Sequence, residues 1–152
     1  MSLENYGTSI KPVSYYDEDT RLTGYVSYPE RKEGGLLHPC VLVVHTAIGP
    51  QEEFIFSKIV ELSRMGYVGF AVDMFGAPDL VFGEEKVKHN KAFKEDRRAC
   101  QRRMLSAFSK AVQDLELVDT QKIAAIGYCF GGLCVLDLAR SGVENLKVSS
   151  LD

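Results

Sequence analysis

One cysteine, Cys129, lies in a pattern that suits covalent chemistry. It is the third residue of Gly-Tyr-Cys-Phe-Gly-Gly, which joins one apolar segment to another. A nucleophile on a sharp turn between a strand and a helix needs room for the backbone two residues before it and two residues after it. Gly127 and Gly131 provide that room, and Gly132 lets the helix and the strand pack closely. The pattern predicts a nucleophile elbow in which cysteine is the nucleophile.

The predicted position also favours ionisation of the Cys129 thiol. Backbone N–H groups at a helix N-terminus stabilise an anion, so a cysteine there carries more thiolate than a free one. The same groups stabilise an oxyanion, and the N–H of Phe130 is the expected donor. A second donor must come from a loop after an earlier strand. The loop His-Thr-Ala-Ile-Gly has the right placement, and we expect the N–H of Ala47 to be that donor.

Two other interpretations of this turn stay open at the level of sequence. A glycine-rich turn can bind phosphate in a mononucleotide fold, but this one has neither Gly-x-Gly-x-x-Gly nor the Lys-Ser/Thr of a phosphate-binding loop. The cysteine is otherwise a structural residue buried on a tight turn. Ligands of open α/β sheets bind beyond the carboxyl ends of the strands, and this context favours the nucleophile.

The composition is that of an ordinary globular protein. Hydrophobic residues make up 45% and charged residues 26% of the 152 residues, so one domain over residues 1–152 is the simplest expectation. The net charge of −3 gives no electrostatic support for binding nucleic acid. No apolar run reaches the ~18 residues of a membrane-spanning helix, and the first residues lack a secretory signal. We therefore expect a cytoplasmic protein without a membrane partner.

The cysteines do not predict a metal site. They lack the paired short spacings of zinc ligands, and a cytosolic protein has little reason to hold disulfides. We expect no metal and no cofactor, and we interpret three of the cysteines as core residues: Cys40, Cys100 and Cys134.

A cluster of arginines follows Glu95 and Asp96 in a segment with helical spacing of apolar residues. The cluster comprises Arg97, Arg98, Arg102 and Arg103. We interpret it as the solvated flank of a helix, balanced by the two acidic residues. A polyanion site is the alternative.

Buried strands alternate with helices along the chain. Five segments have strand patterns: residues 13–16, 22–28, 40–45, 67–73 and 121–128. Three segments have helical spacing of apolar residues: residues 55–65, 93–115 and 131–142. Residues 74–91 are interpreted as irregular. The alternation predicts an α/β fold with a mainly parallel sheet flanked by helices.

With these residues in view, the sequence resembles the dienelactone hydrolase family of the α/β-hydrolase fold. The resemblance rests on residues 41–49, 62–76 and 127–132, and order and spacing agree from about Pro39 to Gly142. It implies an α/β-hydrolase-like fold and hydrolysis of a small carboxylic ester or lactone through a Cys-His-Asp triad. Cys129 takes the role of nucleophile in that triad.

Two departures from the family pattern affect function. Well-studied members have a glutamate in the oxyanion loop that helps to control the resting thiol, and this chain has Thr46 there. The family's histidine and acid follow the nucleophile by several tens of residues, beyond the last residue here. His38 is expected in a loop, His45 at a structural position and His89 in the irregular segment, so none is a good base. We therefore predict that the C-terminal part of the fold is missing.

Two hypotheses about function follow. In the first, the complete protein is a hydrolase of the dienelactone hydrolase type. In the second, this chain is an inactive truncated form that acts, if at all, through association with another chain.

The missing part also has a structural consequence. The strand at residues 122–128 should lie beside the strand at residues 40–45, and the strand that would cover its other side, after Lys147, is expected to be absent. A free strand edge is a template for pairing with another chain, so we expect self-association through this edge. The helix after the elbow should leave several leucines incompletely buried: Leu133, Leu136 and Leu138.

Overall fold

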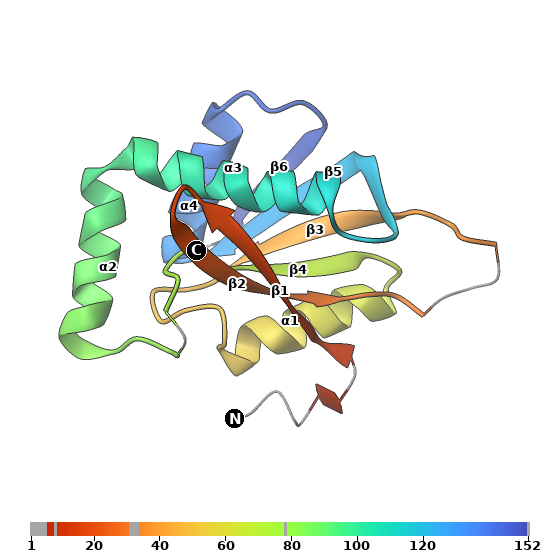
Figure 1. The fold of residues 1–152 in the computed structure, drawn as a ribbon, viewed down its shortest axis with the longest axis horizontal. Helices are drawn as coiled ribbons and strands as arrows, with labels where there is room; N and C mark the ends of the chain where they lie inside the picture. Colours follow the sequence, from red (N-terminus) through yellow and green to blue (C-terminus); the bar gives the residue numbers. More distant parts are fainter. Residues whose placement is uncertain (1–5, 8, 31–33, 78, 152) are drawn as a thin grey trace.

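A six-stranded sheet forms the centre of the computed structural model, which describes residues 6–7, 9–30, 34–77 and 79–151. Its strands are β1 (Lys11–Asp17), β2 (Thr20–Ser27), β3 (His38–Val44), β4 (Val68–Val72), β5 (Val118–Tyr128) and β6 (Leu146–Leu151). They are arranged in the order β1-β2-β4-β3-β5-β6 (Figure 1). Strands β4, β3, β5 and β6 run parallel, while β2 is antiparallel to both β1 and β4. The predicted mainly parallel α/β sheet is confirmed.

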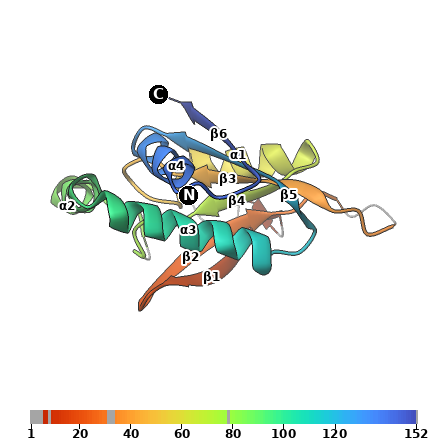
Figure 2. The same ribbon diagram turned by 90° about the horizontal axis from the view of Figure 1, so that it is seen from above.

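Four helices accompany the sheet: α1 (Glu53–Arg64), α2 (Gly83–Glu95), α3 (Arg97–Gln113) and α4 (Phe130–Arg140). Helix α1 packs on one face, and α3 and α4 pack on the other. Figure 2 shows α1 and α3 on opposite sides of the sheet. Helix α2 stands at the end of the molecule toward which the parallel strands run (Figure 1).

The central strands have apolar sequences because both of their faces are covered. Every residue of β4 and the last five residues of β3 are buried. Alternate side chains face opposite ways, so Val41 and Val43 pack with α1, whereas Leu42 and Val44 pack with α3 and α4. The middle of the sheet is thereby fixed as a rigid support for the loops at its ends.

The expectation of an irregular segment at residues 74–91 followed by one long helix was wrong. Helix α2 already begins at Gly83 and ends at Glu95, and α3 begins at Arg97. Asp96 separates them, because its φ of −114° and ψ of 85° are not helical and its Oδ1 accepts from the N–H of Ala99 at 3.0 Å. Apolar periodicity missed α2 because Phe93 is its only buried residue.

The expectation that β5 has a free edge was also wrong. Strand β6 pairs with β5 in parallel, from Ile123 opposite Leu146 to Tyr128 opposite Leu151. The outer strand on this side of the described sheet is therefore β6. Of the leucines on α4, Leu138 is fully buried, contrary to expectation, whereas Leu136 is 41% exposed.

Three arginines of α3 form ion pairs with buried carboxylates: Arg97, Arg102 and Arg103. Arg102 Nε lies 2.8 Å from Asp17 Oδ1, and Arg103 Nε lies 2.9 Å from Asp17 Oδ2. Burial would raise the pKa of Asp17, but hydrogen bonds from both arginines outweigh it and lower that pKa below its usual value. These two cations hold α3 on the β1–β2 hairpin. The solvated-flank interpretation was wrong for Arg103, whose side chain is 12% exposed, whereas the Arg102 side chain is still 45% exposed.

Arg97 has a similar structural role between two helices. Its Nη2 lies 2.8 Å from Oδ1 of Asp137, a buried residue of α4. Since α4 carries the elbow at its N-terminus, this pair helps to fix the elbow helix against α3.

Candidate active site

Cys129 occupies a strained turn between Tyr128, the last residue of β5, and Phe130, the first residue of α4. Its φ is 52° and its ψ is −114°. A residue other than glycine rarely adopts a positive φ, and such a conformation costs about 1–3 kcal/mol. The side chain is exposed, while the other three cysteines are buried. The thiol is therefore held open to solvent at a helix N-terminus, where the elbow pattern places it.

The glycines beside Cys129 are required by close backbone packing. A Cβ on Gly131 would lie 2.7 Å from the carbonyl oxygen of His45 and even closer to that of Val44. A Cβ on Gly127 would overlap the backbone of Gly131. Both positions are too crowded for any side chain, which is the physical reason for the two outer glycines of the pattern.

Gly132 lies in the first turn of α4 and is buried. Its N–H donates to the carbonyl oxygen of Cys129 at 3.0 Å. This hydrogen bond closes the first turn of the helix directly after the thiol.

The two expected oxyanion donors lie on adjoining segments. Strands β3 and β5 are parallel neighbours, with Val44 opposite Gly127, so the carboxyl ends of both strands lie at the same end of the sheet. Strand β3 leads into the loop that contains Ala47, which is buried, and β5 leads into the elbow. Phe130 is the first residue of α4, and an N–H at this position has no acceptor within its own helix. The structure thus brings both donor segments to the end of the sheet that carries Cys129.

Thr46 connects this loop to the beginning of α1. Its Oγ1 donates to Oε2 of Glu52 at 2.5 Å and accepts from the N–H of Ile48 at 3.4 Å. Glu52 directly precedes α1, and its carbonyl oxygen accepts from the N–H of Ile55 at 2.9 Å. Sequence reasoning missed Glu52, because its role depends on a contact across an irregular loop.

His45 is a structural residue. Its Nδ1 lies 2.6 Å from the carbonyl oxygen of Thr46, and its Nε2 accepts from the N–H of Met74 at 3.1 Å. A carbonyl oxygen only accepts, so Nδ1 carries the proton and both ring nitrogens are engaged. Burial lowers the pKa of His45 to about 4, which keeps the ring neutral near neutral pH. His45 therefore ties the end of β3 to the turn after β4.

Residues 22–149 match the model of the dienelactone hydrolase family. The chain belongs to this family. Among solved structures, it is similar to m3DLH, with 28% identity and a TM-score of 0.85. It is equally similar to a dienelactone hydrolase-like promiscuous phosphotriesterase from metagenomic libraries, with 29% identity and a TM-score of 0.85. Each match covers 93% of this chain and 58% of the solved chain.

A more distant solved structure shows a similar pattern of coverage. A dienelactone hydrolase from Anabaena variabilis has 18% identity and a TM-score of 0.65, and the match covers 93% of this chain and 63% of that one. This likeness shows the shared fold. An uncharacterized protein from Caenorhabditis elegans is 42% identical over 43 residues, which are 28% of this chain and 27% of that protein. The chain thus spans less than two thirds of the length of the family structures it matches.

In this member of the dienelactone hydrolase family, His38 lies far from the elbow. It is the first residue of β3, so the expectation of a loop was wrong, and it begins the strand whose other end leads to His45. Its Nδ1 lies 3.0 Å from the carbonyl oxygen of Gly66. His38 is therefore at the amino end of the parallel strands, away from Cys129.

His89 belongs to α2 rather than to an irregular segment. Its ring stacks on Phe75 with the centroids 4.6 Å apart, and its Nε2 lies 3.8 Å from Oε1 of Glu85. Phe75 in turn lies 5.5 Å from Phe130, measured between ring centroids. The ring of Phe75 thus lies between His89 and Phe130, the elbow residue that follows Cys129.

Aromatic side chains flank the elbow on the α1 side as well. Phe54, in the first turn of α1, meets Tyr128 edge to face with the ring centroids 4.7 Å apart. Tyr128 is the residue directly before Cys129. Sequence reasoning missed this contact, because helical spacing gives no sign that the first turn of α1 lies against the end of β5.

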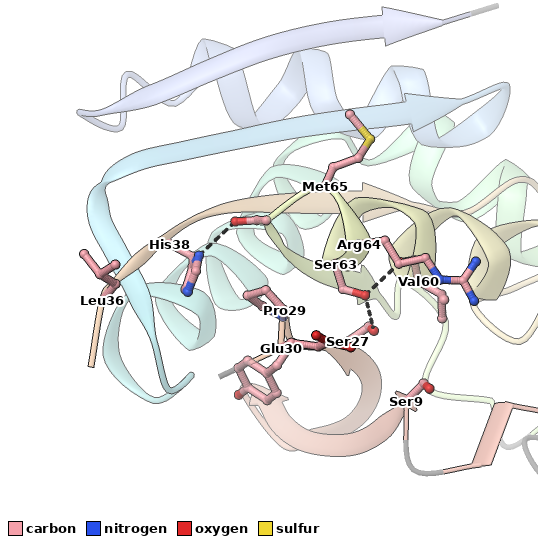
Figure 3. A pocket seen from close by; sticks show the side chains of 12 residues that line it. Ser9, Ser27, Pro29, Glu30, Leu36, His38, Val60, Ser63, Arg64 and Met65 are labelled. Atoms are coloured by element: carbon pink, nitrogen blue, oxygen red, sulfur yellow. Dashed lines mark hydrogen bonds between the residues drawn. The ribbon is translucent and has the colours of Figure 1, made fainter. Parts of the chain in front are cut away.

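A hollow of about 700 Å³ lies elsewhere, near the amino end of β3 (Figure 3). Its lining includes Ser27, His38, Ser63 and Met65. Ser27 Oγ donates to Ser63 Oγ at 3.0 Å, so these buried hydroxyls are engaged with one another. Ligands of parallel sheets bind at the carboxyl ends of the strands, and this hollow lies at the opposite end. Cys129 and its loop remain the candidate site.

The described residues also contain no helix that is long and apolar enough to span a membrane. Among the same residues, no group of three or more His, Cys, Asp or Glu side chains is arranged to hold a metal ion.

Proposed function

We propose that this chain carries the nucleophile of a hydrolase that cleaves a small carboxylic ester or lactone. The observation that carries the proposal is the exposed thiol of Cys129 on a strained backbone at the N-terminus of α4. A side chain is held at a positive φ only where the surrounding structure compels it, and such residues concentrate at functional sites. Membership of the dienelactone hydrolase family supports the reaction class.

In the proposed reaction, the Cys129 sulfur adds to the carbonyl carbon of the substrate. The carbonyl oxygen becomes an oxyanion, which accepts hydrogen bonds from the N–H groups of Phe130 and Ala47. The C–O bond then breaks, and the alcohol leaves with a proton while a thioester forms on Cys129. Water attacks the thioester, releases the carboxylic acid and restores the thiol. The sum is one ester and one water converted to one acid and one alcohol.

The Thr46–Glu52 hydrogen bond supports the loop that presents the Ala47 N–H. Family members with glutamate at the position of Thr46 use that residue to control the thiol. Here Thr46 donates to Glu52, so we propose that position 46 instead stabilises the turn of the oxyanion loop.

None of the three histidines is assigned to the proton relay of the triad. His45 has both nitrogens engaged, and His38 lies at the other end of its strand. His89 stacks on Phe75 and lies near Glu85. We propose that the histidine and acid of a Cys-His-Asp triad are supplied by residues other than these 152. Removal of any member of a catalytic triad costs orders of magnitude in rate.

The lack of an assigned triad histidine favours a second candidate function. In this second candidate, the chain is a non-catalytic form that acts through association with another chain. The two candidates are separated by hydrolysis of p-nitrophenyl acetate, measured for this chain and for a longer form that includes a C-terminal part of the fold. Steady turnover by the longer form that Cys129→Ala abolishes supports the hydrolase. Equal turnover by both forms refutes the second candidate.

A further inference from the structure

Phe54 is a large, exposed aromatic residue at the end of the sheet that carries the candidate nucleophile. It lies in the first turn of α1 and is 47% exposed. Its ring contacts Tyr128 edge to face, with the centroids 4.7 Å apart, and Tyr128 directly precedes Cys129. Edge-to-face packing with Tyr128 leaves much of the Phe54 side chain accessible at the end of the sheet where the thiol lies.

The segment after β4 adds further exposed apolar side chains at this end of the molecule. Phe82, at the beginning of α2, is 61% exposed, and Val87, in α2, is 64% exposed. Helix α2 stands beyond the carboxyl ends of the parallel strands (Figure 1). Exposed apolar side chains thus come from two segments, the start of α1 and the start of α2, that follow neighbouring strands of the sheet.

Two charged residues of α1 lie close to Phe54 in the chain. Glu53 directly precedes it and is acidic, and Lys58, one turn further along α1, has its Nζ 2.7 Å from Oε2 of Glu61. Neither residue offers an unpaired cation to an anionic group. The environment of Phe54 and Tyr128 therefore suits a neutral ring better than an anionic group.

We propose that Phe54 and Tyr128 form a subsite for an aromatic ring of the substrate, so that neutral aryl or arylalkyl esters are the preferred substrate class. This inference rests on the proposed role of Cys129. Tyr128 orients the ring of Phe54, and a ligand ring packs against the accessible part of Phe54. A ring held there lies at the same end of the sheet as the thiol, since Tyr128 is the last residue of β5 and directly precedes Cys129.

Alkylation of Cys129 tests the subsite without any need for turnover. The second-order rates of three reagents are measured at Cys129 by mass spectrometry: iodoacetamide, N-hexyl iodoacetamide and N-benzyl iodoacetamide. Each rate is divided by the rate with glutathione, which removes differences in intrinsic reactivity. We expect the benzyl reagent to exceed iodoacetamide by about tenfold, the magnitude of one well-packed aromatic contact.

Variants at the two ends of α1 identify the origin of this selectivity. In Phe54→Ala the benzyl preference falls to about one, because the subsite is lost. In Met65→Ala, which removes an apolar side chain 65% exposed at the other end of α1, the preference is unchanged. Circular dichroism verifies that both variants are folded. A benzyl preference that survives Phe54→Ala, or one no greater than the hexyl preference, overturns the proposal.

A binding measurement separates failure of the subsite from failure of the proposed function. Saturation-transfer NMR is recorded with N-benzylacetamide, an unreactive neutral amide, on Cys129→Ala and on Cys129→Ala/Phe54→Ala. Binding that requires Phe54 supports the subsite even if the thiol proves inert, in which case only the proposed function fails. Equal saturation transfer in both proteins overturns the subsite.

Discussion

A Cβ atom placed on Gly131 would lie 2.7 Å from the carbonyl oxygen of His45, which is closer than Cβ atoms in proteins approach their neighbours. The first turn of α4 is therefore packed directly against the backbone at the end of β3. This approach fixes the spacing between the elbow and the loop that contains Ala47. The geometry of the candidate oxyanion site thus depends on the absence of a side chain at position 131.

Replacement of Gly131 by valine should destabilise the fold. The new side chain must displace α4 from β3, so we expect the free energy of unfolding to fall by roughly 2 kcal/mol or more. Urea denaturation measures this change. Gly142→Ala is a control, because its Cβ would meet no atom of the described residues within 4 Å and only the cost of a positive φ remains. A loss below about 0.5 kcal/mol in Gly131→Val would contradict the close approach.

Stability should depend on the protonation of His45. Burial lowers its pKa from 6.5 to about 4, so between these values the unfolded chain binds a proton that the folded chain does not. The free energy of unfolding should therefore be largest above about pH 6.5 and should decline as the pH falls toward 4. Urea denaturation at a series of pH values measures the slope.

The stabilisation that Asp17 provides is lost at lower pH than the stabilisation that depends on His45. Its pKa is lowered below 3.8, so its stabilisation is lost only as the pH falls through that region. His45→Phe should remove much of the slope that His45 produces between about pH 6.5 and 4. An unchanged slope in His45→Phe would show that the ring is not held neutral in the fold.

The sequence predicted the sheet and the elbow because their signals are local. Apolar runs identified β3, β4 and β5, and the glycine spacing around Cys129 identified the strand-helix turn whose backbone strain the structure shows. The neighbouring positions of β3 and β5 followed from the family resemblance and are present in the sheet.

The elements that the sequence missed depend on contacts without a periodic signal. Helix α2 buries only Phe93, so its apolar pattern is weak. Asp96 ends α2 and caps α3 within a segment that has helical spacing throughout. The Thr46–Glu52 hydrogen bond spans an irregular loop, and the Phe54–Tyr128 contact joins a helix to a strand that is distant in the chain. Such pairs become visible only once the topology is known.

Cys129 should be the most reactive of the four thiols. Its side chain is exposed at a helix N-terminus, whereas Cys40, Cys100 and Cys134 are buried. Burial raises the pKa of Cys40 to about 12 and also raises that of Cys134, which further reduces their thiolate content. Limited alkylation at neutral pH with peptide mapping should show Cys129 labelled first. Earlier labelling of Cys40 or Cys100 would count against the elbow.

Self-association remains a prediction, with β6 in place of β5 as the interacting edge. Strand β6 is the last strand of the described sheet on its side, so its outer backbone groups have no neighbouring strand there. Such an edge pairs readily with another chain. Light scattering at micromolar concentration should report particles larger than a monomer. A monodisperse species of 16.9 kDa would contradict this prediction.

The role of Cys129 as nucleophile is tested most directly by trapping its thioester. We predict that p-nitrophenyl acetate acetylates Cys129 and releases about one equivalent of p-nitrophenol, because addition of the thiolate needs only the elbow and the oxyanion donors. On the proposal that none of the three histidines activates water, the thioester should persist long enough for peptide mass spectrometry to locate the acetyl group. Acetylation confined to Cys129, with the release abolished in Cys129→Ala, is the predicted result. The same release from Cys129→Ala, or an acetyl group found mainly on other residues, would contradict it.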